Sequence, residues 1–274
     1  MSVEASERAD GEVAIVVLTF NRAHLLEQCV EKVLLRTSPR TTEIVIWDNA
    51  STDDTGAYLD SLDDERIRVV HHDRNIGQSA YARAFRLTVA PYMIELDDDI
   101  IEAPPGWDAT LLDAFRRLPQ IGFLAANLVD NPLDTTAKVM HHTNAHLYSL
   151  EEVNGILLRR GPTGGGCSMT SRDLHDRVGG FRENPKQVFW LEDAAYIADI
   201  EKLGFEASYL DGLRVLHAGG PNYAATTPEK EQFWRHYWKR VERRSAVKRV
   251  LVRIPLVRRL NARYEWFEAP ERSR

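Results

Sequence analysis

Apolar runs alternate with amphipathic segments across residues 13–96. The first run, VAIVVLTF at residues 13–20, is continuous and rich in β-branched side chains, as in a strand that is covered on both faces. The segment after it repeats apolar residues at helical spacing, which predicts a helix. Three further short apolar runs lie at residues 43–49, 67–72 and 91–96. The alternation predicts an α/β fold with a mostly parallel, doubly wound, Rossmann-like sheet that has helices on both faces.

The pattern is less regular beyond this region. Glu192 and Asp193 stand near the start of an amphipathic segment there, and a glycine-rich stretch precedes a short apolar one. The pattern predicts a helix at residues 107–118, a strand at 121–129, mixed strands or a hairpin at 138–158, a short strand within 163–171, a helix at 189–204, and two short strands at 205–210 and 213–217.

Polar residues follow three of the predicted strands, at the point where each strand ends. Asn21 and Arg22 follow the first, Asp48 and Asn49 end the second, and Asp97 to Asp99 follow the fourth. In open parallel sheets the ligand lies beyond the carboxyl ends of the strands. These side chains therefore form the first candidate site.

Three consecutive aspartates at a strand end raise an electrostatic problem. Two carboxylates about 4 Å apart repel by roughly 4 kcal/mol at an effective dielectric of about 20. A divalent cation such as Mg²⁺ or Mn²⁺, shared with a phosphate, would remove the repulsion, because hard cations prefer oxygen ligands. A solvated acidic turn would also relax it. Phosphatases of the haloacid dehalogenase type use a similar Asp pair, but on their first strand rather than their fourth.

Charge is unevenly distributed along the 274 residues. The whole chain has a formal net charge of −6, yet residues 231–274 hold 13 Lys/Arg against 5 Asp/Glu. This asymmetry indicates an acidic globular part with a basic appendage. We expect a disordered lead-in at residues 1–12, a catalytic domain at 13–228 and a basic amphipathic helical extension at 229–274.

The extension has two main interpretations. Its apolar and basic residues at 229–267 suit either a helix packed on the domain or a helix that lies on a membrane surface. No nucleic-acid-reading motif accompanies the charge, so no nucleic-acid partner is expected. Cys29 and Cys167 lack metal-ligand spacing, and we find neither a signal peptide nor an apolar run of about 20 residues. We therefore expect a cytoplasmic protein, with peripheral attachment to the inner face of the membrane as an option.

The order of the motifs resembles the family 2 glycosyltransferases, which have the GT-A fold. The resemblance spans about 200 residues, and the matching positions occur in the family's order. They are Thr19, Phe20, Asn21, Arg22, Asp48, Asn49, Ser51, Asp53, Thr55, Asn75, Gly77, Asp97, Asp98, Asp99, Gly179, Gly180, Phe181, Glu192, Asp193 and His217.

The resemblance implies a nucleotide site. Asp48 would accept a hydrogen bond from the base, Phe20 would stack on the base where the family often has Tyr, and Asp97 would bind the ribose. Asp98 belongs to the same motif, but its side chain should point elsewhere if the segment stays extended. The remaining implied nucleotide contacts are Thr19, Asn21, Arg22, Asn49, Asn75, Gly77 and Arg83.

The resemblance also implies a metal, a base and a sugar pocket. Asp99, with Asp97 and His217, would hold Mn²⁺ or Mg²⁺. Asp193 would be the general base, with Glu192 as the fallback. Gly165 and Gly166 would contact the donor sugar. The family often continues with a second acid two residues after the base, whereas this chain has Ala195 there.

These roles describe an inverting glycosyltransferase that uses a nucleotide-diphosphate sugar. Family frequency favours a UDP-sugar, and the acceptor would be a hydroxyl on a lipid-linked or polysaccharide molecule. Two alternatives stay open: a metal-dependent phosphotransferase or nucleotidyltransferase, and a catalytically silent module that binds nucleotide sugars.

Overall fold

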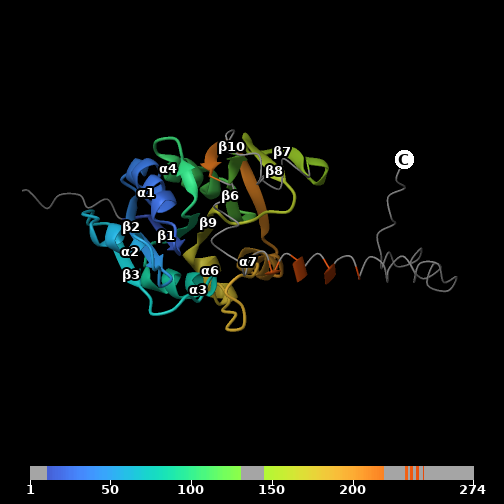
Figure 1. The fold of residues 1–274 in the computed structure, drawn as a ribbon. Coiled ribbons are helices and arrows are strands. Elements are labelled where there is room, and N and C mark those ends of the chain that lie inside the picture. The colour runs from blue at the N-terminus through green and yellow to red at the C-terminus, as the bar shows by residue number, and fades with distance from the viewer. Residues whose placement is uncertain are drawn as a thin grey trace, which may run out of the picture. The chain divides into compact units, whose positions relative to one another are not determined.

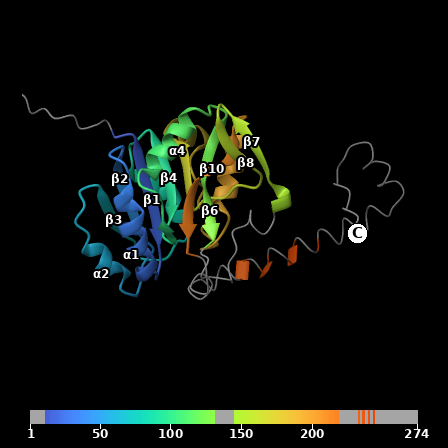
Figure 2. The ribbon, with the colours of Figure 1, turned by 90° about the horizontal axis from the view of Figure 1, so that it is seen from above.

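A mixed 10-stranded sheet runs through the computed structural model, which describes residues 11–130, 145–218 and seven positions between 232 and 243 (Figures 1 and 2). Neighbouring strands follow the order β3-β2-β1-β4-β9-β6-β10-β8-β7, and β5 pairs with β10. The strands are β1 (Val13–Thr19), β2 (Thr41–Asp48), β3 (Ile67–His71), β4 (Tyr92–Asp97), β5 (Ile100–Glu102), β6 (Ile121–Asp130), β7 (Ser149–Val153), β8 (Ile156–Arg160), β9 (Cys167–Ser171) and β10 (Glu206–His217).

The first four strands form a parallel half-sheet. Their register aligns Thr19 of β1 with Asp48 of β2, and Asp48 with His71 of β3. Leu18 aligns with Asp97 of β4. The carboxyl ends of the four strands therefore lie along one edge, as the sequence pattern predicts. Beyond β4 the sheet becomes mixed, because β9 runs antiparallel to both β4 and β6 whereas β10 runs parallel to β6.

Helices cover both faces of the sheet, with α1 and α4 on one side and α3, α6 and α7 on the other (Figure 1). The amphipathic patterns that follow the strands account for these two layers. The helices are α1 (Ala23–Lys32), α2 (Thr55–Asp60), α3 (Ser79–Ala84), α4 (Trp107–Arg116), α6 (Arg172–Val178) and α7 (Glu192–Glu201), with 3₁₀ turns η1 (Leu34–Arg36), η2 (Phe85–Leu87) and η3 (Ala145–Leu147).

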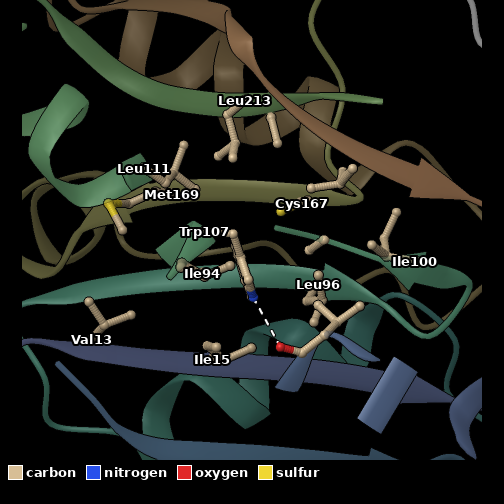
Figure 3. Packing of buried hydrophobic residues seen from close by; sticks show 14 of the residues in the cluster. Val13, Ile15, Ile94, Leu96, Ile100, Trp107, Leu111, Cys167, Met169 and Leu213 are labelled. Atoms are coloured by element: carbon tan, nitrogen blue, oxygen red, sulfur yellow. Dashed lines mark hydrogen bonds between the residues drawn. The ribbon is translucent and has the colours of Figure 1, made fainter. Parts of the chain in front are cut away.

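Trp107 lies in the core between the sheet and the α1–α4 layer (Figure 3). Its side chain is fully buried, and its indole Nε1 donates a hydrogen bond to the carbonyl of Val33 at 3.1 Å. Cys29 and Cys167 are buried in the same core as free thiols. The core thus includes residues of β1, β2 and β4, the strands whose ends carry the first candidate site.

Some elements differ from the sequence prediction. The two short strands expected at 205–210 and 213–217 are one strand, β10, whose register against β6 shifts between Leu210 and Arg214. Helix α6 was not predicted; Ser171 caps it by accepting a hydrogen bond from the Leu174 N–H, and Gly179 ends it with a φ of 81°. Short helices carry too few periodic positions to stand out. Part of the region expected to form a hairpin, residues 131–144, lies outside the described residues.

The chain divides into two compact units, Met1–Thr226 and Thr227–Arg274. Seven positions of the second unit are described and are helical: Gln232, Phe233, Arg235, His236, Lys239, Arg240 and Arg243. Most of the lead-in and of the segment at 229–267 lies outside the described residues. Within the described part of the chain, no helix combines the length and the apolar character needed to cross a membrane.

Candidate active site

Asp48 is held from two sides at the end of β2. Its carboxylate is buried; Oδ1 accepts a hydrogen bond from the Ser51 N–H at 2.9 Å, and Oδ2 lies 3.1 Å from Nδ1 of His71. The other imidazole nitrogen of His71 lies 3.1 Å from Asp60 Oδ1. The hydrogen bond with Asp48 outweighs burial and, with the help of Asp60, raises the pKa of His71 above its ordinary value. Asp48 is thus fixed in orientation and faces an imidazole whose charged form it favours.

The loop after β1 is tied to the loop after β2. Asn21 has a φ of 52°; its N–H donates to Ser51 Oγ at 2.8 Å, and its Oδ1 accepts from the Thr52 N–H at 2.7 Å. The N–H of Ala23 donates to Asp53 Oδ2 at 3.2 Å. The polar residues that follow the first two strands therefore hold one another, which explains why both loops need side chains that bind backbone N–H groups.

Asn49 links the same edge to the loop before α3. Its Oδ1 accepts from the Ile76 N–H at 3.3 Å, and its Nδ2 donates to the Gly77 carbonyl at 3.4 Å. Asn75 Oδ1 accepts from the Gly77 N–H at 2.8 Å. Gly77 has a φ of 55°, and a Cβ there would overlap the Val188 carbonyl. Only glycine fits this position, because a side chain would clash and its backbone conformation would be strained.

Asp97, Asp98 and Asp99 have three different environments. The Tyr81 hydroxyl donates to Asp97 Oδ1 at 3.3 Å. Arg22 Nη1 contacts Asp98 Oδ1 at 2.8 Å and Asp99 Oδ2 at 3.2 Å. We expected Asp98 to point elsewhere if the segment stayed extended, and this condition is not met. Residues 98 and 99 form a turn between β4 and β5, so the alternation of an extended strand stops at Asp97.

The ion pairs redistribute charge at this turn. Burial disfavours the charged guanidinium, but Asp98 and Asp99 outweigh it and raise the pKa of Arg22. Burial also raises the pKa of Asp98, against the lowering effect of Arg22. Arg22 thus supplies part of the positive charge that three adjacent aspartates require.

Two of the metal ligands that we expected, Asp99 and His217, lie close together. His217 Nε2 at the end of β10 lies 3.3 Å from Asp99 Oδ1. A carboxylate oxygen and an imidazole nitrogen suit Mn²⁺, and an Mg²⁺-type site needs only one or two protein carboxylates when phosphates complete it. Within the described residues no group of three His, Cys, Asp or Glu side chains has the arrangement of a complete metal site. The donor set therefore fits an ion whose remaining ligands come from a bound diphosphate or water.

Asp193 stands in the first turn of α7. Its Oδ2 accepts from the Gly165 N–H at 2.8 Å, and its Oδ1 accepts from the Ala194 N–H at 2.6 Å. Glu192 is only 9% exposed, and burial, followed by the charges of Asp193 and Glu95, raises its pKa well above the ordinary value. The two neighbouring acids thus have different environments: Glu192 is buried, and Asp193 accepts two backbone hydrogen bonds in a half-buried position.

Glu95 is a buried acid of the site that we did not predict. It lies two residues before Asp97 on β4, so both side chains project from the same face of the strand. Burial, followed by the charges of Asp193 and Asp97, raises its pKa well above the ordinary value. A charged residue inside an apolar strand, at even spacing from a site residue, was the signal in the sequence.

The glycine-rich segment before β9 passes directly over these acids. A Cβ at Gly165 would overlap Glu95 Oε1, one at Gly164 would lie 3.1 Å from Asp193 Oδ2, and one at Gly166 would lie 3.3 Å from Asp97 Oδ2. The run lacks side chains because the backbone has to approach three carboxylates closely.

The remaining predicted residues are placed as follows. Thr19 is buried at the end of β1, and Phe20 is half-buried directly after it. Arg83 pairs with Glu183 at 2.9 Å rather than with the acids of the site. Trp47, which we did not predict, stacks on His72 with ring centroids 5.1 Å apart beside Asp48.

Comparisons with known proteins identify the family of this chain. The profile of the family described as Glycosyl transferase family 2 matches residues 14–179, more than half of the chain. Glycosyltransferase GlyG of Streptococcus pneumoniae serotype 4 is 35% identical over 95 residues, which are 33% of this chain and 31% of that protein. The match thus spans about a third of this relative's length.

Solved structures show a similar fold. The mannosyltransferase PcManGT from Pyrobaculum calidifontis, in complex with GDP-Man and Mn²⁺, has a TM-score of 0.59 at 19% identity, over 84% of this chain and 64% of that one. Glucosyl-3-phosphoglycerate synthase from Mycobacterium tuberculosis, in complex with Mn²⁺, UDP and glucosyl-3-phosphoglycerate, has a TM-score of 0.52 at 17% identity, over 80% and 76%. The fold is that of the GT-A glycosyltransferases. With a family match over most of the region that carries the site, the chain belongs to glycosyltransferase family 2.

Proposed function

We propose that this protein is an inverting glycosyltransferase that transfers a sugar from a nucleotide-diphosphate sugar, with UDP favoured as the nucleotide, to an acceptor hydroxyl. The observation that carries the proposal is the hydrogen bond between the Gly165 N–H and Asp193 Oδ2, at 2.8 Å. This hydrogen bond joins α7, which carries the proposed base, to the glycine-rich backbone that covers Asp97. The proposed base and the acids proposed to lie beside the diphosphate would therefore line one site.

Asp193 is the proposed general base. Direct displacement needs one group that removes the acceptor's proton, and a positioned carboxylate can do this. Glu192 is the weaker candidate, because burial raises its pKa and so disfavours the charged carboxylate that a base requires. Two backbone N–H groups fix the orientation of Asp193 before the acceptor arrives.

The nucleotide would lie along the ends of the parallel strands. Asp48, held by Ser51 and His71, has lone pairs left to accept a base N–H. Phe20 would stack on the base, and Asp97, oriented by the Tyr81 hydroxyl, would bind the ribose. Asn21, Asn49, Asn75 and Gly77 shape the loops of this edge in the structure, and we assign them to the nucleotide site through that role.

Asp99 and His217, with Asp97, would hold Mn²⁺ or Mg²⁺. A bound cation would supply positive charge that stabilises the departing diphosphate. Mn²⁺ in the two similar glycosyltransferase complexes supports this assignment. Arg22 keeps Asp98 and Asp99 in place and neutralises part of their charge. The remaining negative charge of the turn would be neutralised by the metal ion.

Substitution of Asp193 by Asn tests the base. Asp193→Asn should lower transfer by about 10²–10⁴-fold, the usual contribution of a general base, and should leave the affinity for UDP unchanged. The matched control is Glu201→Gln, the same carboxylate-to-amide change at an exposed position of α7, which should retain full turnover. Normal turnover in Asp193→Asn, with loss in Glu192→Gln, would assign the base to the other acid.

A donor screen tests the reaction class. With Mn²⁺ present, we expect hydrolysis of a UDP-sugar to UDP and free sugar in preference to GDP- and dTDP-sugars. A module that only binds nucleotide sugars would give affinity without hydrolysis, and a nucleotidyltransferase would transfer the nucleoside monophosphate and release a sugar 1-phosphate instead of a nucleoside diphosphate. Absence of binding and of hydrolysis for every donor would overturn the proposed function.

The acceptor and the location belong to the same proposal. We propose a lipid-linked or polysaccharide acceptor and a cytoplasmic protein that attaches to the inner face of the membrane through residues 229–267. The excess of basic residues in the C-terminal part of the chain supports this choice.

A further inference from the structure

Asp48 is a buried acid whose charge needs a partner. It is 3% exposed, and the Ser51 N–H supplies a hydrogen bond but no net charge. Arg22, the guanidinium at this edge, is engaged with Asp98 and Asp99. The group that the structure places against Asp48 is the imidazole of His71, which comes from the neighbouring strand at the aligned register position and is cationic when protonated.

The two nitrogens of His71 have different acceptors at the same distance. Nδ1 lies 3.1 Å from Asp48 Oδ2, and Nε2 lies 3.1 Å from Asp60 Oδ1. A neutral imidazole carries one N–H and can donate to one acceptor only, whereas imidazolium donates to both. The side chain of Asp48 is buried and that of Asp60 is 75% exposed, so Asp60 supports the charged form of His71 from the solvent side.

We infer that His71 is a positioning residue for nucleotide recognition: it orients the Asp48 carboxylate for the ring N–H of the base, and Asp60 on α2 keeps His71 charged for that role. The inference rests on the proposed function, because Asp48 reads the base only if the chain binds a nucleotide diphosphate. It concerns affinity rather than chemistry, since His71 lies on the nucleotide side of the sheet edge and Asp193 on the other. The charged groups that face His71 are Asp48 from β2 and Asp60 from α2.

Two substitutions of His71 separate orientation from packing. In His71→Asn the amide nitrogen takes the place of Nδ1 and can still donate to Asp48, whereas His71→Leu has no donor. The side chain of His71 is 43% exposed, so neither change leaves a buried cavity, and thermal unfolding should be nearly unchanged. With Mn²⁺ present, UDP should bind about tenfold more weakly to His71→Leu, as expected when a hydrogen bond to a charged group is lost. His71→Asn should restore most of the affinity.

Steady-state kinetics should also separate an orienting role of His71 from a packing role. We expect the KM for the donor to rise in His71→Leu while kcat changes little, because the base Asp193 is untouched. A merely structural role of His71 would lower both parameters together and would not be rescued by Asn.

The pH dependence tests the charge. Wild-type affinity for UDP should fall as the pH rises through the pKa of His71, because the neutral imidazole gives a weaker hydrogen bond than imidazolium. Asp60→Asn should shift this midpoint to lower pH, since it removes a carboxylate that favours the charged form. Asp63→Asn is the matched control: it makes the same change at an exposed position near the same helix and should leave the midpoint in place. The profile of His71→Asn should be flat.

Two failures can be told apart. A wild-type chain that binds neither UDP nor GDP overturns the proposed function, and this inference falls with it. A wild-type chain that binds UDP, while His71→Leu binds it equally well or Asp60→Asn keeps the wild-type midpoint, overturns the role of His71 alone.

Discussion

At the scale of single residues, the site depends on glycines, which have no side chain, as much as on its acidic side chains. The backbone at Gly165 donates to Asp193 and lies against Glu95, and there is no room for a methyl group between them. Glu95 cannot move away easily, because it is 3% exposed beneath this segment. The position of the proposed base is thus set by a packed contact between one glycine and one buried acid.

Substitution of Gly165 by Ala should therefore damage catalysis more than stability. The added Cβ would overlap Glu95 Oε1, and this overlap is relieved only if the segment moves away from Asp193. Because small displacements of catalytic groups lower the rate strongly, we expect kcat to fall at least about tenfold. The measurement is kcat with a saturating donor, alongside a thermal unfolding curve.

Gly56→Ala is the matched control for this prediction. A Cβ at Gly56 would meet no atom within 4 Å, and the position is helical, so both activity and stability should be kept. A second variant, Gly165→Ala with Glu95→Asp, shortens the acid and should recover part of kcat. Full activity in Gly165→Ala would contradict the packed-contact explanation.

At the scale of elements, an aromatic cluster supports the helices beneath the site. His175 of α6 packs on Phe85, Phe181 and Tyr196, with ring centroids 5.5, 5.6 and 5.7 Å apart. Tyr196 belongs to α7, the helix that carries Asp193, so this cluster fixes the helix from below. His175 is only 5% exposed, and burial lowers its pKa to about 4.

This cluster should make the fold sensitive to acid. The folded state keeps His175 neutral, whereas the unfolded chain protonates it near its ordinary pKa, so stability is complete above about pH 6.5 and falls as the pH drops towards 4. The loss should reach up to about 3 kcal/mol, because each unit of pKa difference contributes about 1.4 kcal/mol.

Chemical denaturation between about pH 4.5 and 7.5 measures this effect. In His175→Phe the pH dependence should be shallower, since the titrating group is gone and an aromatic ring still fills the cluster. His146→Phe changes an exposed histidine and should keep the wild-type slope. Parallel curves for wild type and His175→Phe would show that His175 does not carry the acid sensitivity.

At the scale of the whole molecule, the sheet brings two kinds of chemistry to one edge. The parallel half, from β3 to β4, ends in the residues assigned to the nucleotide; β10 adds His217 from the mixed half, and α7 adds Glu192 and Asp193. The C-terminal unit, Thr227–Arg274, is basic. Its charge is opposite in sign to that of the rest of the chain.

Removal of residues 229–274 should reduce binding to anionic vesicles. Each Lys or Arg near such a surface contributes about 1 kcal/mol, and salt screens the attraction, so binding of the full chain should weaken at high ionic strength. Vesicle sedimentation with anionic and with purely zwitterionic lipid measures the difference. Vesicle binding that is unaltered by the truncation would refute the proposed membrane role of the segment.

The sequence by itself determined which segments of residues 13–96 form strands, the polar residues at the ends of those strands, and the family. These features are local: β-branched runs, helical periodicity and motif order can be read without knowing which segments meet. The fold class and the edge at which Asp48 and Asp97 lie were therefore predictable. Helix α6 and the continuity of β10 were not, because short elements and shifted registers leave weak periodic signals.

Tertiary structure alone decided which groups touch. Arg22 and Asp98 are 76 residues apart in the chain, and Gly165 and Asp193 are 28 apart, so no local pattern could pair them. The turn at Asp98 and Asp99, the contact between His71 and Asp48, and the burial of Glu95 follow from how β3, β4 and α7 pack. Ionisation and orientation depend on burial and neighbouring charge, which exist only after the chain has folded.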